Sequence, residues 1–514
     1  MKNKKHIILI LLILAVIYIV DAHIYKRDST DPHLSGFGFV FLFLALLNSK
    51  KNIFNIIGGF LSILFFLEIF YFIEFRESLS IGVLDSIVET NKTESLLMLS
   101  HYIFPIILPA ILTTVAIFLI FNKNKNKLPS WFNFLPVIFY TLFVVSLSSE
   151  IISNKNRLIA DFKEDPHELG KYIKDKFPIV IGNISYIVNA SLHNDRYHVN
   201  NITKYFDNSI ASQHSSENKL IILIIGESAL PTRFSLYGYT KNTTPSLDNI
   251  FSSPDSCIIR QAHSSAPITR NSISLSLSFY TPESEENLFN KKSIIEMAQA
   301  QGYKTYWLGA QPIKGVHGSK YGFIASKSDI LDIQEDNDDL LPISLKKALS
   351  DKNEKKFIII HLWGSHKPYI NYTDAEKHTL KNTDDYDLTI YHTDNVIKNI
   401  YREITAVTND YTLIYTSDHG EIVNKGHGFK TGLDQFLVPF LYKSSNPDYN
   451  CQFIEKYRNQ NGWISGLMNK YILSELLGYS LNTEIVNKEK ENDRVLSIDE
   501  IPEPFSVYLN ENHK

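Results

Sequence analysis

A series of near-continuous apolar stretches in the first third of the chain places the strongest constraint on its fold. Most of these stretches are long enough to cross a bilayer core of about 30 Å as a helix. The second is at the lower limit for spanning and also fits a tilted or re-entrant helix. The pattern predicts a transmembrane domain of five helices within residues 1–152. The stretches cover residues 6–22, 36–48, 53–75, 103–122 and 131–149.

Lysine clusters indicate how these helices are oriented. The clusters precede the first stretch and follow the second and the fourth (Lys2, Lys4, Lys5, Lys50, Lys51, Lys123, Lys125 and Lys127). Because cytoplasmic loops collect lysine and arginine, an odd number of spans exports everything after Ile152. A cleavable signal peptide is the alternative for the first stretch, but no small-residue cleavage site follows it.

The exported part divides into a polar segment and a segment of alternating structure. Residues 153–216 are polar and broken, which predicts a linker with short helices, some of them on the membrane surface. Residues 217–514 are long enough for one large domain, in which alternating pieces predict an α/β sheet with helices on both faces. The strand-like pieces are Leu220–Ile225, Lys304–Leu308, Phe357–His361, Tyr411–Tyr415 and Val438–Leu441, and helix-like pieces include Ser293–Gln301 and Thr389–Val407.

Potential metal ligands follow two of the predicted strands. Glu227 comes directly after the first strand, and Asp418 and His419 follow the fourth. The carboxyl ends of parallel strands are where an open α/β sheet binds ligands. Carboxylates and neutral imidazole suit zinc or manganese. The sequence therefore predicts a metalloenzyme.

Several motifs then resemble one family in their order along the chain. The segment Gly226–Pro245 resembles the signature of the bacterial phosphoethanolamine transferases, which are inner-membrane enzymes of the alkaline phosphatase and sulfatase superfamily. The resemblance implies an α/β/α sandwich in the periplasm behind a multi-pass inner-membrane anchor. Later motifs that fit the same family are Trp307–Gln311, Gly364–Pro368, Tyr386–Ile397, Ser417–Glu421, Gly426–Gly428 and Val438–Phe440.

The resemblance implies a role for each candidate site residue. Thr269 would be the nucleophile and would share a zinc ion with Glu227, Asp418 and His419. His366 and His427 would bind a second metal, or bind the transferred phosphate and protonate the leaving oxygen. Asn91 and Glu94, in the second exported loop, match a segment that the family places near its active site, and they would contact substrate. Ser228 would be a turn residue or would support the ligands.

Alternatives remain open for these residues. Thr269 could be only the N-cap of a helix, and a glycine-flanked histidine such as His366 or His427 could be an ordinary surface residue. A sulfatase is the nearest rival chemistry. Sulfatases of the superfamily carry Cys/Ser-x-Pro-x-Arg, whereas the segment that starts at Ser265 has Thr269 in place of that arginine, and Arg270 is displaced by one position.

The implied reaction moves phosphoethanolamine from phosphatidylethanolamine to a lipopolysaccharide acceptor, either a lipid A phosphate or a core sugar, through a phosphothreonine-type intermediate. Zinc is expected, with a second ion or manganese as less favoured variants, in a chain that acts as a monomer. A phosphoglycerol transferase that draws on phosphatidylglycerol, and a degenerate scaffold, are the other readings. Modified lipid A would bind cationic peptides such as polymyxin less well. The net charge of −4 argues against nucleic acid as a partner.

The remaining expectations concern single residues outside this set. Cys257 and Cys451 could form a disulfide in an exported protein, or could equally be free and buried. His361 is expected to be a buried, hydrogen-bonded core residue, and Asp394 to be structural. The acidic run Gln334–Asp339 is expected to be a solvated loop. Gly309 and Ala310 replace a more usual Ser-Asn pair, while His263, His317, His378 and His392 have weaker claims to a role.

Overall fold

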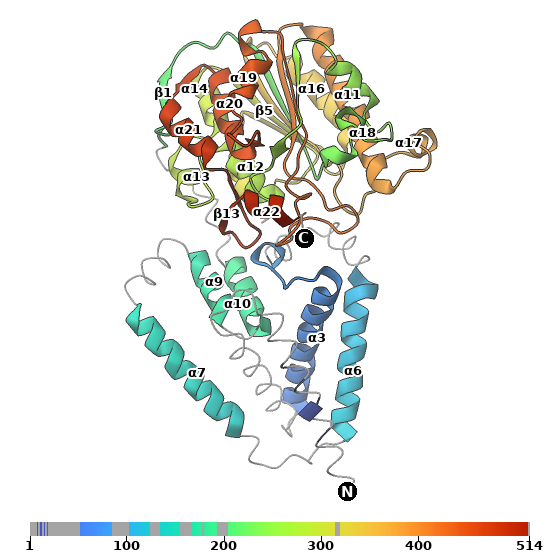
Figure 1. The fold of residues 1–514 in the computed structure, drawn as a ribbon, viewed down its shortest axis with the longest axis vertical. Helices are drawn as coiled ribbons and strands as arrows, with labels where there is room; N and C mark the ends of the chain where they lie inside the picture. The colour runs from blue at the N-terminus through green and yellow to red at the C-terminus, as the bar shows by residue number, and fades with distance from the viewer. Residues whose placement is uncertain are drawn as a thin grey trace. The chain divides into compact units, whose positions relative to one another are not determined.

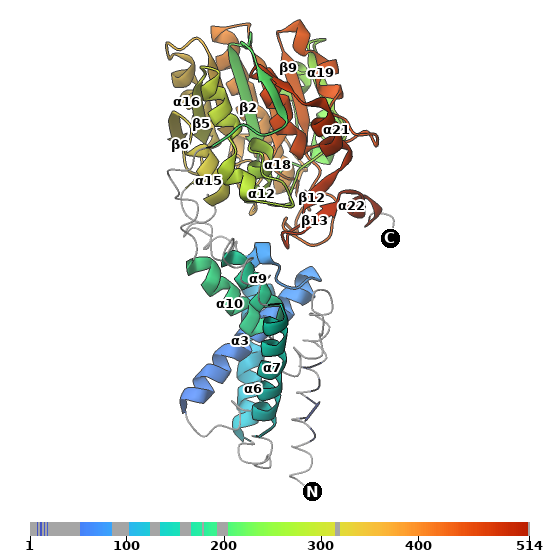
Figure 2. The same cartoon turned by 90° about the vertical axis from the view of Figure 1, so that its left-hand side faces the viewer.

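A computed structural model describes residues 52–84, 102–123, 134–154, 166–176, 179–192, 204–313 and 319–511 and a few single residues between 8 and 18. The chain divides into two compact units, Met1–Arg196 and Tyr197–Lys514, both drawn in Figure 1 and Figure 2. This division falls inside the predicted linker 153–216. The first part of that segment therefore belongs to the N-terminal unit, and its end belongs to the catalytic unit.

The described part of the N-terminal unit is helical. Helix α9 (Pro166–Lys176) and helix α10 (Ile179–Leu192) pack closely at Gly182. A Cβ on this glycine would lie only 2.6 Å from the carbonyl oxygen of Lys174. Asn183 on α10 donates a hydrogen bond of 3.2 Å from Nδ2 to Glu68 Oε2 on α3. The other helices are α3 (Asn52–Phe75), η2 (Ile103–Ile107), α6 (Leu108–Lys123) and α7 (Phe134–Ser153).

The predicted membrane spans are tested only in part. Among the described residues, Ile56–Phe75 is long and apolar enough to cross a membrane, with a mean hydropathy of 2.3, and Ile103–Ala116 is a shorter apolar helix. Helix α7 overlaps the fifth predicted stretch. The first two stretches lie almost entirely outside the described residues. The five-helix count therefore stays a prediction.

A seven-stranded mixed sheet forms the centre of the catalytic unit, in the order β3-β9-β8-β2-β7-β5-β6. Strands β8, β2, β7, β5 and β6 are parallel to one another, and β9 runs antiparallel between β8 and β3. The predicted α/β sheet is thus confirmed. The strands are β2 (Leu220–Gly226), β3 (Ser256–Ile259), β5 (Lys304–Gly309), β6 (Ile330–Ile333), β7 (Lys356–His361), β8 (Thr412–Ser417) and β9 (Phe440–Ser444).

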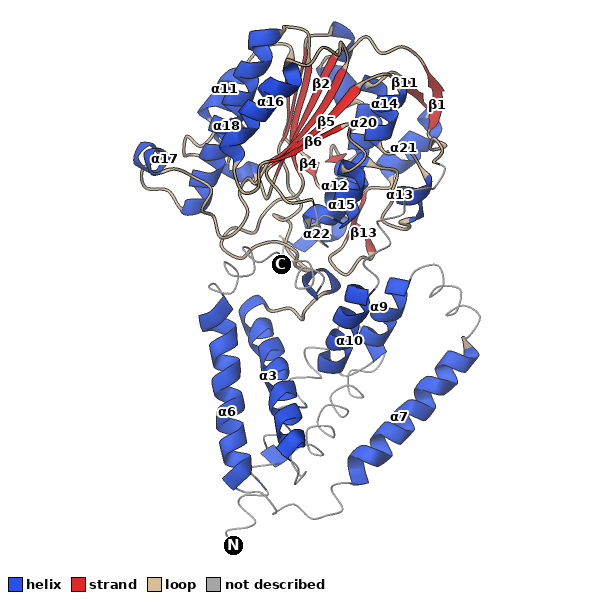
Figure 3. Cartoon of the chain, turned by 180° about the vertical axis from the view of Figure 1, so that it is seen from behind, coloured by secondary structure: helices blue, strands red, loops and turns tan. Residues whose placement is uncertain are grey.

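Helices cover both faces of this sheet, as Figure 3 shows. Side chains of β2 alternate between two cores: Ile221 packs on one face, and Ile222 packs on the other. Helices α11 (Pro245–Ile250), α16 (Leu341–Leu349) and α18 (Asp385–Val407) pack on the face of Ile222. Helices α12 (Thr269–Leu277), α14 (Ile294–Ala300), α15 (Ser319–Ala325) and α20 (Asn469–Leu476) pack on the face of Ile221.

Short elements complete the catalytic unit. Its other α-helices are α13 (Glu286–Asn290), α17 (Asp374–Thr379), α19 (Cys451–Glu455), α21 (Thr483–Glu491) and α22 (Ser506–Glu511). Three two-stranded pairs join β1 (Ile210–Gln213) to β11 (Tyr479–Leu481), β4 (Ala262–His263) to β10 (Ile464–Ser465), and β12 (Arg494–Leu496) to β13 (Pro502–Pro504). A disulfide links Cys257 on β3 to Cys451 on α19, which resolves the two alternatives for these cysteines.

Candidate active site

The candidate metal ligands lie where two adjacent parallel strands end. Gly226 on β2 pairs with Ser417 on β8, so the residues that follow each strand emerge side by side. The Asp418 N–H donates to the carbonyl of Gly226 over 3.0 Å. Ser228 has φ 55°, a left-handed conformation that turns the chain sharply after Glu227. This geometry brings the Glu227 and Asp418 carboxylates together.

His419 completes a buried three-residue cluster. Its Nε2 lies 3.3 Å from Glu227 Oε1 and 3.3 Å from Asp418 Oδ2. Its Nδ1 lies 2.9 Å from the carbonyl oxygen of Gly420, which can only accept a hydrogen bond. Nδ1 therefore carries a proton, and Nε2 is the ring nitrogen that faces the two carboxylates. A histidine held in this way is a typical metal ligand.

The electrostatics of this cluster fit a bound cation. Burial, and after it the charge of Glu227, raise the pKa of Asp418 well above its ordinary value. Burial alone would raise the pKa of Glu227 too, but the imidazoles of His419, His366 and His427 hold that pKa below its usual range. Asp418 Oδ2 is buried and accepts no hydrogen bond. The two adjacent buried carboxylates, one of them with an unused oxygen, and His419 Nε2 match the oxygen and nitrogen ligands of zinc.

Thr269 is the first residue of α12 and faces this cluster. Its Oγ1 donates to Glu227 Oε2 over 3.1 Å and lies 3.3 Å from His419 Nε2. The N-cap of the helix is Ile268, so Thr269 is not the N-cap. The start of α12 also places backbone N–H groups and the positive end of the helix dipole beside the hydroxyl. Such a position favours a developing alkoxide and an anionic phosphate.

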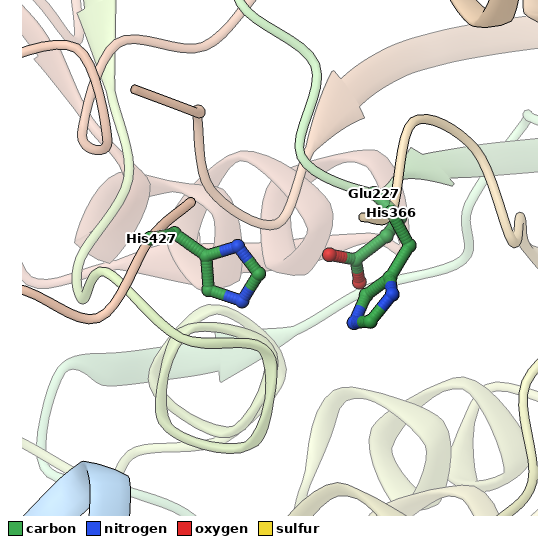
Figure 4. A group of neighbouring side chains, drawn as sticks. All are labelled: Glu227, His366 and His427. Carbon is green, nitrogen blue, oxygen red and sulfur yellow. The ribbon is translucent and has the colours of Figure 1, made fainter. Parts of the chain in front are cut away.

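His366 and His427 are both partly exposed and lie near Glu227, as Figure 4 shows. One side-chain atom from each of these three residues lies within 4.8 Å of the others. The His366 and His427 ring centroids are 5.8 Å apart, and the His427 ring is 4.1 Å from that of His419. The structure thus brings together six of the predicted site residues. Asn91 and Glu94 lie outside the described residues.

Ser228 turns the chain and supports Glu227, as expected, and three further residues near the cluster, Gln311, Glu421 and Tyr369, were not predicted as site residues. Gln311 Nε2 donates to Glu227 Oε2 over 2.8 Å, and the Ser228 hydroxyl donates to Glu227 Oε1 over 2.7 Å. Glu421 contacts His427, and Tyr369 in turn contacts Glu421. The motifs Trp307–Gln311 and Ser417–Glu421 contain two of these residues, but sequence spacing alone gives no sign of which atoms they contact.

Two expectations for single residues were wrong. His361 is fully buried on β7, but neither ring nitrogen has a hydrogen-bond partner, and burial lowers its pKa to about 4. Its neighbours are the rings of Trp307 and Tyr321, which offer no acceptor at its nitrogens. The acidic run is not fully solvated, because Asp338 is buried and accepts from the N–H groups of Trp363 and Gly364, over 2.7 Å and 2.9 Å.

Asp394 and the described histidines His263 and His392 have polar partners outside the cluster. His263 Nε2 lies 2.9 Å from Asp493, and His392 Nδ1 lies 3.0 Å from Glu376. His378 is exposed on α17, and His317 is outside the described residues. Asp394 accepts from the backbone N–H groups at the start of α11, including that of Leu247 at 2.8 Å, which is a structural contact.

Residues 219–469 match the sulfatase family. The chain is 25% identical to the phosphoethanolamine transferase EptC of Escherichia coli (strain K12) over 486 residues, covering 82% of this chain and 80% of that protein. The fold is similar to the integral membrane lipooligosaccharide phosphoethanolamine transferase A of Neisseria meningitidis, with TM-score 0.64, 16% identity, and coverage of 94% and 97%. It is also similar to the periplasmic domain of Escherichia coli EptC in complex with Zn, with TM-score 0.51, 21% identity, and coverage of 59% and 97%. The resemblance read from the sequence is confirmed.

Proposed function

Because residues 219–469 carry a sulfatase-family domain, we propose that this chain transfers phosphoethanolamine from phosphatidylethanolamine to a lipopolysaccharide acceptor, either a lipid A phosphate or a core sugar. Similarity to a protein named phosphoethanolamine transferase over 82% of the chain supports the group transferred. The placement of the Thr269 hydroxyl carries the proposal: it lies between Glu227 and His419 at the start of a helix.

Glu227, Asp418, His419 and Thr269 would hold one zinc ion. When bound, zinc would lower the pKa of the Thr269 hydroxyl and offset charge on the transferred phosphate. The periplasmic domain of Escherichia coli EptC, a relative in fold, was solved in complex with Zn. The Ser228 and Gln311 side chains each donate to one oxygen of Glu227, so they fix the orientation of this carboxylate. Gly364 packs directly against the backbone of the same residue: a Cβ there would lie 2.9 Å from the backbone nitrogen of Glu227, so a larger side chain would displace it.

The reaction takes place in two steps. In the first, Thr269 Oγ1 forms a bond to the phosphorus of phosphatidylethanolamine, and the phosphorus–oxygen bond to diacylglycerol breaks. The leaving oxygen takes up a proton, and Thr269 keeps the phosphoethanolamine group. In the second, an oxygen of the acceptor forms a bond to the same phosphorus, the bond from phosphorus to Thr269 Oγ1 breaks, and Oγ1 takes up a proton in place of the one it gave up in the first step. His366 and His427 would bind the transferred phosphate and protonate the leaving oxygen. Such a sequence predicts ping-pong kinetics.

The apolar N-terminal stretches would anchor the enzyme in the bacterial inner membrane with the catalytic unit in the periplasm. Donor and acceptor are both amphiphiles, so an anchored enzyme meets them in the plane of the bilayer. Asn91 and Glu94, in the second exported loop, would contact the donor head group. The intact set Glu227, Thr269, Asp418 and His419 argues against a degenerate scaffold.

The test offers the purified full-length protein fluorescent phosphatidylethanolamine and phosphatidylglycerol in parallel detergent micelles, and follows diacylglycerol release. Release from phosphatidylethanolamine alone is expected, and Thr269→Ala should abolish it. Release from phosphatidylglycerol instead would make the protein a phosphoglycerol transferase. Activity that survives in Thr269→Ala would overturn the choice of nucleophile.

The acceptor needs a separate measurement. Lipid A and core from a host that expresses the wild-type chain should gain the mass of one phosphoethanolamine, and those from a host that expresses Thr269→Ala should not. If the added group is on lipid A, the lower surface charge should reduce polymyxin binding. Unchanged masses of both lipid A and core would exclude a lipopolysaccharide acceptor.

A further inference from the structure

A buried carboxylate, Glu421, joins Tyr369 to His427 beside the cluster. The Tyr369 hydroxyl donates to Glu421 Oε1 over 2.6 Å, and His427 Nδ1 lies 2.8 Å from Glu421 Oε2. Glu421 has no exposed surface, while the His427 side chain is 19% exposed and so reaches the open site. A fully buried carboxylate without a cation beside it must have its oxygens satisfied by donors, and here two side chains supply them.

The direction of the first hydrogen bond follows from the partners of Tyr369. Its oxygen accepts from the backbone N–H of Asn424 over 3.1 Å, so its own proton is available for Glu421. Burial, and after it the charge of Glu421, raise the pKa of Tyr369 above its ordinary value, so the hydroxyl keeps its proton. Tyr369 is therefore the donor, and Glu421 Oε1 the acceptor.

The proton on His427 follows from the two neighbours of Nδ1. One is Glu421 Oε2, and the other is the Ser228 hydroxyl oxygen at 3.4 Å. Ser228 has a single proton, which it donates to Glu227 Oε1 over 2.7 Å, so its lone pairs face His427. Nδ1 thus meets two acceptors and carries the proton. Nε2 is then the ring nitrogen that neither of these two acceptors holds.

We propose that Tyr369 and Glu421 are positioning residues that hold His427 by Nδ1 and fix its orientation, so that Nε2 is the nitrogen left to contact the reacting phosphate. Figure 4 shows the His427 ring across from Glu227 and His366, where that phosphate would bind. The inference rests on the proposed function, because it gives His427 a task in the transfer. Carboxylates that hold a functional histidine by its other nitrogen act in the same way.

A double-mutant cycle tests whether Tyr369 acts through His427. In the full-length protein with fluorescent phosphatidylethanolamine, Tyr369→Phe should lower kcat about tenfold, with KM and zinc content unchanged. In a His427→Ala background, Tyr369→Phe should cause no further loss. An equal loss in both backgrounds would show that Tyr369 acts on the fold and not through His427, and would overturn the proposal.

Tyr372→Phe is the matched control, because Tyr372 follows in the same loop and its hydroxyl donates to Asp385 at the surface over 2.8 Å. It should behave as wild type. A readout without turnover separates this inference from the proposed function: nitrogen-15 spectra of histidine-labelled full-length protein, with the His427 signals assigned by His427→Gln. A protonated Nδ1 is expected. A neutral ring protonated at Nε2 would overturn the proposal even if the protein proves to be the expected transferase.

Discussion

At the scale of single residues, the burial of two carboxylates at the strand ends lowers the stability of the folded protein. Glu227 and Asp418 are both buried, and their mutual repulsion adds to the cost of removing each from water. Without a metal ion, the two buried carboxylates therefore destabilise the catalytic unit. A bound zinc ion would offset their charge and stabilise it. The cluster should make the stability of the catalytic unit depend on zinc.

Asp418→Asn should separate these two effects. The substitution removes the buried charge, so the variant in chelator should unfold about 2–4 °C above the wild type in chelator, as expected for about 1 kcal/mol in a unit of this size. Added zinc should raise the melting temperature of the wild type but barely that of the variant, because one ligand is lost. Thermal unfolding with and without zinc measures both. An equal zinc effect in the two proteins would exclude Asp418 as a ligand.

How far single residues could be predicted depends on where their partners lie. Glu227, Asp418 and His419 follow apolar strands, so their common edge could be read from the sequence. Glu421 and Tyr369 meet across 52 residues through loops, and no local pattern indicates that contact. The partners of His361 could not be predicted for the same reason, since its neighbours come from another strand and a helix.

At the scale of elements, the position of α12 decides where Thr269, the proposed nucleophile, lies. Ser272, one turn after Thr269, donates its hydroxyl to the carbonyl of Asp418. This bond ties the helix to the strand end that carries two of the proposed ligands. One turn further on, Ser276 donates to the carbonyl of Gly466 over 3.2 Å, away from the cluster.

Ser272→Ala should therefore affect catalysis more than stability. We expect kcat to fall about tenfold, because a small displacement of Thr269 spoils the angle of attack, and the melting temperature to fall about 2 °C. Ser276→Ala should cause the same thermal loss but keep the wild-type kcat. Steady-state kinetics and thermal unfolding of both variants make the comparison. Equal losses of kcat in the two variants would mean that the Ser272 hydrogen bond has no particular role in positioning Thr269.

The ion pair between α17 and α18 should make stability depend on pH. Burial would lower the pKa of His392, but the hydrogen bond and charge of Glu376 raise it above its ordinary value. Burial would raise the pKa of Glu376, but His392 and the N–H of Thr373 lower it to about 2. The His392 contribution is thus complete below about pH 6.5 and is lost as pH rises through its raised pKa.

His392→Gln should then lower the melting temperature by about 2 °C near pH 6 and by less near pH 9, where the wild-type imidazole is neutral. His378→Gln is the control, since His378 is exposed on α17. Differential scanning calorimetry across this range gives the result. A pH-independent difference between wild type and His392→Gln would contradict the assignment of a charged pair.

Elements were predictable where burial on both faces gives a continuous apolar run. Strands β2, β5, β7 and β8 begin within one residue of the predicted positions, because parallel strands under two helical layers contain few polar residues. Strand β9 begins two residues later than predicted, since Val438 and Pro439 still belong to the preceding loop. The two-residue strands β4 and β10 are too short to leave a pattern.

At the scale of the whole molecule, the catalytic unit begins before the domain boundary predicted at residue 217. Strand β1 pairs with β11, and the Tyr205 N–H donates to the carbonyl of Asn290 over 3.0 Å. A fragment of residues 197–514 should therefore fold and bind zinc, whereas a fragment of residues 217–514 should melt several degrees lower, because it leaves the β11 edge uncovered. Thermal unfolding of the purified fragments decides this. Equal melting temperatures would restore the later boundary.

The disulfide acts on the same scale, because Cys257 and Cys451 close a loop with a sequence separation of 194. Replacing both cysteines by serine should lower the free energy of unfolding by about 2–5 kcal/mol, since the unfolded chain regains the freedom that the crosslink removes. Urea titration of the 197–514 fragment measures this loss. Zinc content should stay unchanged, because neither cysteine is near the cluster. A fragment that loses zinc along with the disulfide would contradict that separation.

The strand-end ligands also have a consequence for damaged copies of the enzyme. Ser228 and Asp418, which share a hydrogen bond beside the metal cluster, are 190 residues apart in the chain. A nascent chain that stalls before Asp418, or one that a protease cuts there, holds Thr269 and Glu227 but lacks Asp418 and His419, two of the proposed ligands. If the proposed function holds, such a fragment would leave the phospholipids around it intact, because the set of proposed ligands forms only when distant parts of the chain have folded together.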